Sequence, residues 1–211
     1  MSSTLHRPHE AIGNDVVATK HGDNVVFRNY LVDRPGHTKG LRAAEAVLEV
    51  LITLPYPVGK VWPVFKNFNA WMNRFGYVWD GLPAEKENDF VYLGNTGSSN
   101  DMSYGSDGSR TKYVVRKVVP EQLIYFDSLP LPLVGKDGVW TGHNLMSLHG
   151  KDGITEISVF MEHTWHSETM TIEELRAEAR AIMFGAALEF WRDYFVPDLT
   201  CLLKTGKTAT A

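Results

Sequence analysis

The 211-residue chain lacks most features that mark disulfide-rich, membrane-spanning or nucleic-acid-binding proteins. Its single cysteine, Cys201, excludes an internal disulfide, and no apolar run approaches the roughly 18 residues of a membrane span. The first twenty residues lack the apolar stretch of a secretory signal, so a cytoplasmic location is expected. A net charge of −4 and the absence of long basic runs argue against nucleic acid or an anionic membrane surface as the main partner.

Sequence motifs for metal, phosphate or nucleophilic chemistry are also missing. There is no HExxH motif, cysteine cluster or acidic triad, and strand alternation would send the imidazoles of His163 and His166 to opposite faces. The glycines at 94 and 97 do not lead from a buried strand into a helix, as a phosphate-binding loop would. Cys201 is best explained as a small apolar residue near a helix end. We therefore expect neither a metal nor a cofactor.

Aromatic side chains, by contrast, are plentiful: six Trp, eight Tyr and ten Phe. The length suits one domain with a sizeable core. We expect an N-terminal extension over 1–45, a ligand-binding domain over 46–205 and a disordered tail over 206–211. Within the extension, 24–33 suits one extra strand, and 34–40 has loop chemistry. The extension either packs on a neighbouring copy, giving a homodimer, or is a plain tail, and the tail is favoured.

The segment after residue 45 reads as a strand followed by a short helical stretch. The apolar run 46–54 predicts the strand, and Pro57 can open a helix because its missing N–H is not needed there. Pro63 lies too deep for one long helix, so two short helices or a kink are expected. The apolar residues that recur at three- and four-residue steps are Val61, Trp62, Phe65, Phe68 and Trp71.

A first hairpin follows a short strand at 90–93 and a polar loop at 94–110, which is either a lid or a plain loop. Strands 111–118 and 122–128 flank a turn at Pro120 and Glu121, and this register pairs Arg116 with Tyr125. The face expected to point inward carries Thr111, Tyr113, Val115, Ile124, Phe126 and Ser128.

A second hairpin joins 140–149 to 154–166 through a turn at 150–153. Its outward face carries Ser147, Glu156, Ser158 and Glu162. Its inward face carries Trp140, Asn144, Met146, Leu148, Ile157, Val159, Met161, His163 and Trp165. Two polar residues, Asn144 and His163, thus interrupt an otherwise apolar face.

The last segment, 171 to about 203, predicts a long helix that begins with a capping box formed by Thr171 and Glu174. Pro197 should kink or end it. The residues expected to face the core are Leu175, Ala179, Ile182, Met183, Ala186, Phe190 and Tyr194.

This layout resembles the START/SRPBCC superfamily, which includes polyketide cyclases and ligand carriers. The resemblance rests on Pro57 and the aromatic residues that follow it, on the strand order and on the long closing helix, and it covers about 45–205. It implies an α+β helix-grip fold, in which a curved antiparallel sheet wraps around a long C-terminal helix. In that fold the sheet and the helix enclose an internal cavity. The motif is structural, so it supports the fold more than any activity.

His163 and Asn144 are the candidate catalytic residues. The imidazole would move a proton and the amide would orient a ligand carbonyl or hydroxyl, although the two could instead only satisfy each other. Tyr113 and Ser128 are weaker candidates, for which bonding across the sheet is favoured. The expected ligand-binding residues are Tyr113, Ser128, Trp140, Met146, Met161, Trp165, Met183, Phe190 and Trp71.

These residues predict binding of a hydrophobic, aromatic or polycyclic small molecule. One hypothesis adds catalysis of cyclisation, dehydration or a related lyase step, largely by holding the substrate in a reactive shape. The rival is a non-catalytic carrier or sensor. A third hypothesis is a module that binds and regulates another protein through an exposed apolar groove.

Overall fold

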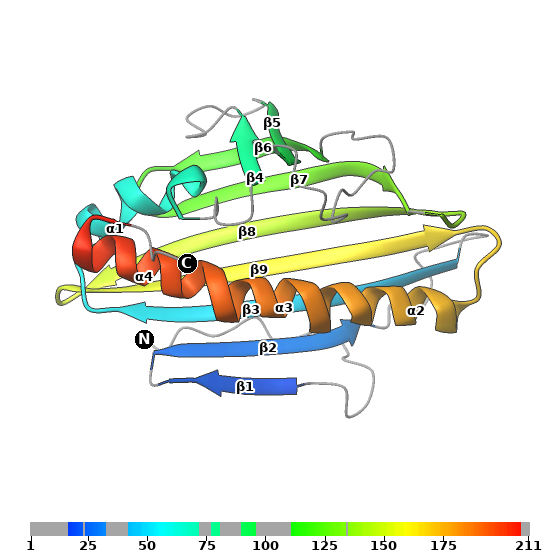
Figure 1. Ribbon diagram of the computed structural model, residues 1–211, viewed down its shortest axis with the longest axis horizontal. Helices are drawn as coiled ribbons and strands as arrows, with labels where there is room; N and C mark the ends of the chain where they lie inside the picture. Colours follow the sequence, from blue (N-terminus) through cyan, green and yellow to red (C-terminus); the bar gives the residue numbers. More distant parts are fainter. Residues whose placement is uncertain are drawn as a thin grey trace.

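The computed structural model of the protein describes residues 17–22, 24–32, 42–71, 77–80, 90–95, 111–133 and 135–207. Over these residues a single antiparallel sheet has nine strands in the order β1-β2-β3-β9-β8-β7-β6-β5-β4 (Figure 1). The strands are β1 (Val17–His21), β2 (Val25–Val32), β3 (Arg42–Leu54), β4 (Tyr77–Asp80), β5 (Phe90–Asn95), β6 (Thr111–Val119), β7 (Leu123–Pro132), β8 (Val139–Lys151) and β9 (Ile154–Ser167).

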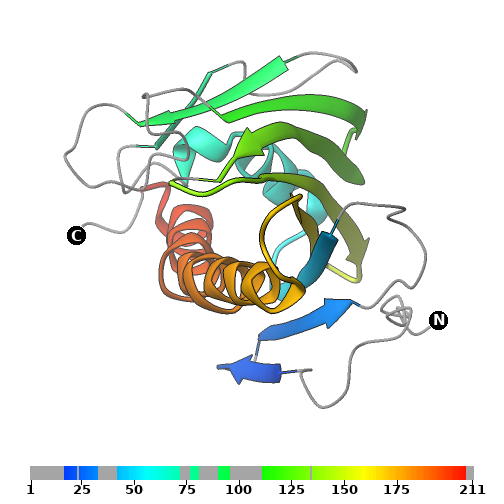
Figure 2. The ribbon, with the colours of Figure 1, turned by 90° about the vertical axis from the view of Figure 1, so that its right-hand side faces the viewer.

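A long C-terminal helix crosses one face of this sheet, which we call the inner face. It consists of α2 (Ile172–Arg180), η3 (Ala181–Ala186), α3 (Ala187–Glu189), η4 (Phe190–Phe195) and α4 (Val196–Thr205). Seen close to end-on, the helix lies on the concave side of the curled sheet (Figure 2). Two short helices, α1 (Val58–Phe65) and η1 (Phe68–Ala70), follow β3. The expected α+β helix-grip architecture is confirmed, as are two short helices after the strand, although Pro63 lies inside α1 rather than between the two.

The second hairpin has the predicted faces and a tight turn. Lys151 pairs with Ile154, leaving a two-residue turn in which Asp152 and Gly153 both have positive φ, as the hairpin twist requires. Alternation then buries the predicted inner residues Met146, Ile157 and Val159.

The first hairpin follows its predicted register only in part. Tyr113 pairs with Ser128 as expected, but a β-bulge at Arg116 makes Lys117 the partner of Tyr125. The prediction that Arg116 pairs with Tyr125 is therefore wrong, because a bulge sets two residues of one strand against one of the other. The described inner-face residues, Tyr113, Val115, Ile124, Phe126 and Ser128, are all buried as predicted.

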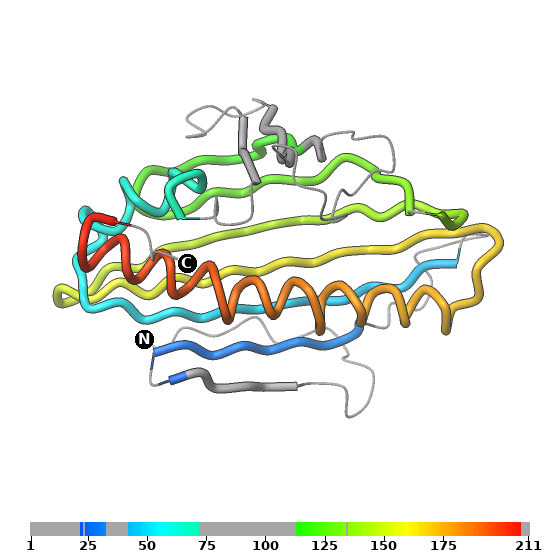
Figure 3. The backbone as a smooth tube through the Cα atoms, viewed as in Figure 1, coloured from blue at the N-terminus to red at the C-terminus, as the bar shows by residue number. Residues whose placement is uncertain are grey.

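The long helix continues through Pro197 to Thr205, so of the two expected outcomes, a kink or an end at this proline, the end does not occur (Figure 3). Its start is as predicted: Thr171 accepts from the Glu174 N–H, and the Glu174 carboxylate accepts from the Thr171 N–H.

The second half of the predicted inward stripe is displaced by one residue. Trp191 and Phe195 are buried, whereas Phe190 and Tyr194 are only half-buried. The cause is two π-helical segments, η3 and η4. In an α-helix each four-residue step overshoots a full turn by about 40°. The wider π turns cancel that drift, so residues spaced by four stay on the sheet side.

Strands β1 and β2 belong to the segment expected to be an extension with one extra strand. The segment contributes two strands, and β3 begins at Arg42 rather than at residue 46. On the outer face the Tyr30 hydroxyl and Arg28 both donate to the Glu49 carboxylate. Burial, reinforced by that carboxylate, raises the pKa of Tyr30. On the inner face the Asn29 amide donates to the Met183 carbonyl within η3 at 2.9 Å.

Residues 96–110, most of the predicted polar loop, lie outside the described residues. Among the helices that the structure describes, none is long and apolar enough to cross a membrane.

Candidate functional site

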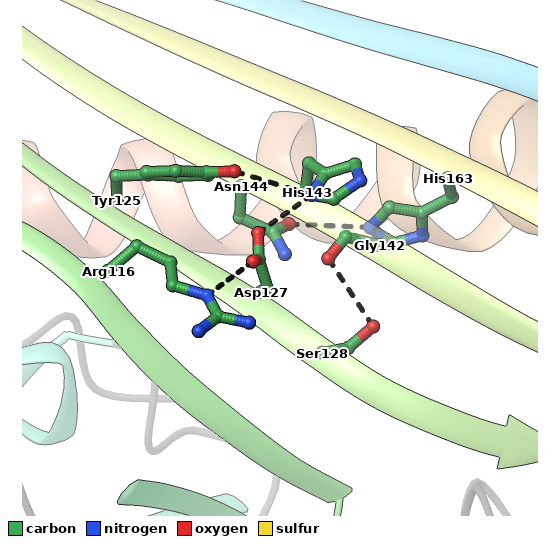
Figure 4. Close-up of polar contacts among 8 residues, drawn as sticks. All are labelled: Arg116, Tyr125, Asp127, Ser128, Gly142, His143, Asn144 and His163. Carbon is green, nitrogen blue, oxygen red and sulfur yellow. Dashed lines mark hydrogen bonds and ion pairs between the residues drawn. The ribbon is translucent and has the colours of Figure 1, made fainter. Parts of the chain in front are cut away.

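Asn144 and His163 meet on the inner face, as the alternation of β8 and β9 predicts. The His163 Nε2 lies 3.3 Å from the Asn144 Oδ1, and the two side chains are 5 % and 3 % exposed, respectively (Figure 4). The neighbouring inner-face residues Met146 and Val159 are apolar and buried. The pair is therefore a polar island within an apolar layer.

Aromatic rings fix the plane of the imidazole. Trp140 stacks on His163 with ring centroids 4.9 Å apart and an interplanar angle of 23°, and Trp165 lies 6.0 Å away at a tilt. Gly142 is directly opposite His163 in the register. A Cβ on Gly142 would lie 2.5 Å from the His163 Cδ2, which is closer than real Cβ contacts come. Gly142 thus creates the space that the imidazole fills.

Each member of the pair has one buried hydrogen-bonding atom left over. The Nδ1 of His163 and the Nδ2 of Asn144 have no hydrogen-bond partner, although both are inaccessible to solvent. Leaving a buried polar group unpaired costs about 1–3 kcal/mol, so each of these two atoms calls for an explanation.

Burial makes His163 a neutral side chain at physiological pH. Desolvation, with a smaller contribution from His143, lowers the pKa of His163 from 6.5 to about 3. At pH 7 the ring therefore acts as an uncharged donor and acceptor rather than as an imidazolium.

Met161 is the partly buried member of the inner face beside the pair. It pairs with Asn144 on one side and with Leu48 on the other, both buried, yet it is itself only partly buried. Its sulfur accepts a hydrogen bond from the Trp191 Nε1 at 3.3 Å. The inner face beside the pair is therefore less completely buried at Met161 than on the strands to either side.

The other predicted ligand-binding residues fall into separate groups. Tyr113 packs edge-on against Phe126, and the Ser128 hydroxyl donates to the Gly142 carbonyl at 3.5 Å, so the favoured cross-sheet bonding of Ser128 is present. Met146 and Met183 are buried in the core. Trp71 is enclosed by an aromatic cluster comprising Phe65, Phe68, Trp191 and Phe195. Half-buried Phe190 stacks on Phe195.

Three residues close to this arrangement were absent from the predicted set: Gly142, Asn29 and Trp191. A glycine between two inward-facing residues of a strand marks a close approach, so the position of Gly142 was a readable signal. Asn29 is the polar residue at an inward position of β2. Trp191 could be placed only with knowledge of the π turns.

A second polar group lies on the outer face of β6, β7 and β8. Asp127 accepts from the Arg116 Nε at 2.6 Å and from the His143 Nδ1 at 2.7 Å (Figure 4). Burial tends to raise the pKa of Asp127, but hydrogen bonds from His143, Arg116 and Tyr125 outweigh it and hold that pKa below its usual value. This carboxylate is well satisfied, which fits a cross-strand contact that stabilises the sheet.

Metal-ligating side chains do not gather among the described residues, where no group of three or more His, Cys, Asp or Glu side chains could hold an ion. His163 and His166 occupy alternate-face positions of β9. Cys201 is half-buried, and its Sγ lies 3.7 Å from the Thr205 hydroxyl.

Replacing Gly142 by alanine should displace the imidazole and break its bond to Asn144. We expect a loss of about 1–3 kcal/mol in the free energy of unfolding, measured with urea, because the added methyl overpacks a filled site. Gly185→Ala is the matched control, since a Cβ there meets nothing within 4 Å. It should leave stability unchanged or raise it by up to about 1 kcal/mol. Equal effects of the two substitutions would contradict the close packing of Gly142 on His163.

Comparison with known proteins gives the fold and no family. No family model matches the chain, and no curated protein matches it in sequence. Truncated norcoclaurine synthase from Thalictrum flavum aligns over 80 % of this chain and 99 % of its own, with a TM-score of 0.51 and 8 % identity. A protein from Arthrobacter aurescens aligns over 75 % of this chain and 86 % of its own (TM-score 0.50, 13 % identity). A protein of unknown function from Staphylococcus aureus aligns over 76 % of this chain and 95 % of its own (TM-score 0.50, 10 % identity). At such identities the likeness shows a shared fold alone.

Proposed function

We propose that this protein is a START/SRPBCC-like binding protein that holds a mainly apolar, aromatic small molecule between the sheet and the long helix. The observation that carries this proposal is the Asn144–His163 pair, which presents two unpaired hydrogen-bonding atoms on an apolar inner face. The partial exposure of Met161 supports it, because a ligand needs access to that face. The aromatic and aliphatic side chains around the pair would supply most of the affinity by burying apolar surface.

The structure favours binding without turnover over the cyclase, dehydratase or lyase alternative. Catalytic proton transfer works best with a group whose pKa lies near the working pH. Burial holds the pKa of His163 near 3, so at neutral pH the imidazole is a weak base and is not in the imidazolium form that could act as an acid. An enzyme named norcoclaurine synthase shares this fold, so catalysis remains the alternative function. Catalysis by His163 would require a ligand that raises the pKa of the imidazole on binding.

Native mass spectrometry of protein purified without added ligand tests the proposal. We expect an adduct of small-molecule mass that organic extraction releases, and a carrier should return the extracted compound unchanged after prolonged incubation. The matched variant, Asn144→Leu with His163→Leu, keeps similar volumes but removes the polar pair, so it should lose most of the adduct. An identical adduct on the parent protein and the double variant would contradict binding at the Asn144–His163 pair. Conversion of the extracted compound during incubation would favour the enzymatic alternative.

A further inference from the structure

The long helix has two alternative registers, and its apolar residues do not choose between them. Without π turns, Phe190 and Tyr194 would face the sheet, as regular helical spacing predicts. With the π turns of η3 and η4, Trp191 and Phe195 face the sheet instead. Both stripes consist of large aromatic side chains, so burial of apolar surface favours neither strongly. Because π turns are rare in proteins, their presence calls for a stabilising contact from another element.

Asn29, at an inward position of β2, supplies such a contact at η3. In an α-helix the Ala187 N–H would donate to the carbonyl of Met183, four residues earlier. In η3 this N–H donates to the carbonyl of Ile182, five residues earlier. The Asn29 side-chain amide donates to the Met183 carbonyl at 2.9 Å, so it replaces the donor that the π turn takes away. The Asn29 side chain is buried, and a hydrogen bond at such a carbonyl is costly to leave unmade.

The register of the helix decides which ring lies beside the Asn144–His163 pair. A π turn holds one residue more than an α-helical turn, and one residue corresponds to a rotation of about 100° around the helix axis. In the π register the Trp191 Nε1 donates to the Met161 Sδ at 3.3 Å, and Met161 pairs with Asn144 in the sheet. In the α register Phe190 would take this place, and its side chain has no N–H to donate.

We propose that Asn29 is a positioning residue: its bond to the Met183 carbonyl holds η3 in the π register and thereby places Trp191 against Met161. Strand β2 belongs to the N-terminal segment, for which a dimer contact and a plain tail were the sequence-based expectations. With this role the segment instead shapes the inner face of the sheet. The helix has its register with or without a ligand, so the role of Asn29 does not depend on the proposed binding function.

Asn29→Leu tests this role, because leucine has a similar volume and cannot donate a hydrogen bond. In protein with ¹³C-labelled methionine methyl groups, a nuclear Overhauser effect reports contact between the Met161 methyl group and the Trp191 indole N–H. We expect this signal in the parent protein and a severalfold weaker one in Asn29→Leu. Val25→Ala is the matched control, since Val25 is buried at another inward position of β2 and makes no hydrogen bond to the helix through its side chain. The signal should persist in this control.

Deleting Gly185 from the Asn29→Leu variant should reverse the effect. Gly185 lies in η3, and a Cβ there would meet nothing within 4 Å, so the deletion shortens the π turn and removes no side-chain contact. The shortened turn is α-helical, the Met183 carbonyl regains a backbone donor four residues later, and Trp191 keeps its face toward the sheet. We expect the deletion to restore the signal between Trp191 and Met161 and to raise the midpoint of urea unfolding above that of Asn29→Leu.

A merely structural role for Asn29 would not be rescued by shortening the helix. An unchanged signal in Asn29→Leu would overturn the positioning role, and so would a deletion that lowers the unfolding midpoint further. If Asn29→Leu alone does not fold, recovery of folded protein with the Trp191–Met161 signal on deletion of Gly185 supports the role, and failure to recover it overturns the role.

Discussion

In a His163→Gln variant, the free energy of unfolding should fall far less between pH 6 and pH 4 than it does in the parent protein. Burial lowers the pKa of His163 from 6.5 to about 3, so within this window the unfolded chain binds a proton that the native protein does not. Stability from the buried neutral ring is therefore complete above pH 6.5 and is lost as the pH falls. The slope is roughly 1.4 kcal/mol per pH unit, or about 3 kcal/mol over two units.

Glutamine is the right replacement because it can still bond to Asn144 but does not titrate. Urea unfolding at pH 7.5, where both side chains are neutral, gives the cost of the substitution itself. The difference between the two proteins at lower pH then isolates protonation of His163. Parallel stability curves down to pH 4 would mean that the imidazole is not held neutral by burial.

Replacing Trp71 by alanine should destabilise the protein by about 3–5 kcal/mol, the largest loss expected from one substitution here. Trp71 is 1 % exposed and stacks on Phe65 at 5.5 Å, and it contacts Trp191 and Phe195 on the long helix. Its Nε1 donates to the Phe65 carbonyl at 3.2 Å. The ring thus joins the short helices after β3 to η4.

Trp71→Phe separates the ring from the hydrogen bond. Phenylalanine keeps an aromatic ring in the cluster but leaves the Phe65 carbonyl without this donor, so a smaller loss of about 1–2 kcal/mol is expected. Thermal or urea unfolding measures both variants. A loss below about 1 kcal/mol for Trp71→Ala would show that the cluster does not join the helices in the way described.

The sequence predicted the two hairpins well because strand alternation is a strict period. Once Met146 and Val159 were placed inward, Asn144 and His163 followed by parity, and the structure buries all four. Parity fails where a strand gains a residue, and nothing in the residues around Arg116 announced the bulge there. The helix was harder: the choice of Trp191 over Phe190 depends on η3 and η4, and π turns have no signal in the apolar spacing alone.

The residue types of the candidate site could be predicted from the sequence, but their hydrogen bonds and the pKa of His163 could not. An imidazole and an amide on an apolar face were visible in the sequence, and both a ligand site and a self-satisfied pair remained open. The structure adds what spacing cannot give: one bond of 3.3 Å joins the pair, and the Nδ1 and Nδ2 atoms stay unpaired. It also adds the low pKa of His163, which depends on complete burial by side chains from several strands.

The central claim is that a ligand makes its polar contacts with Asn144 and His163. Nuclear magnetic resonance of protein labelled with ¹⁵N observes the His163 ring nitrogens and the Asn144 side-chain amide directly, during titration with the compound that organic extraction releases. Both sets of signals should move in proportion to occupancy, while those of exposed His149 stay in place. Saturation of the protein with the His163 and Asn144 signals unmoved would contradict the claim.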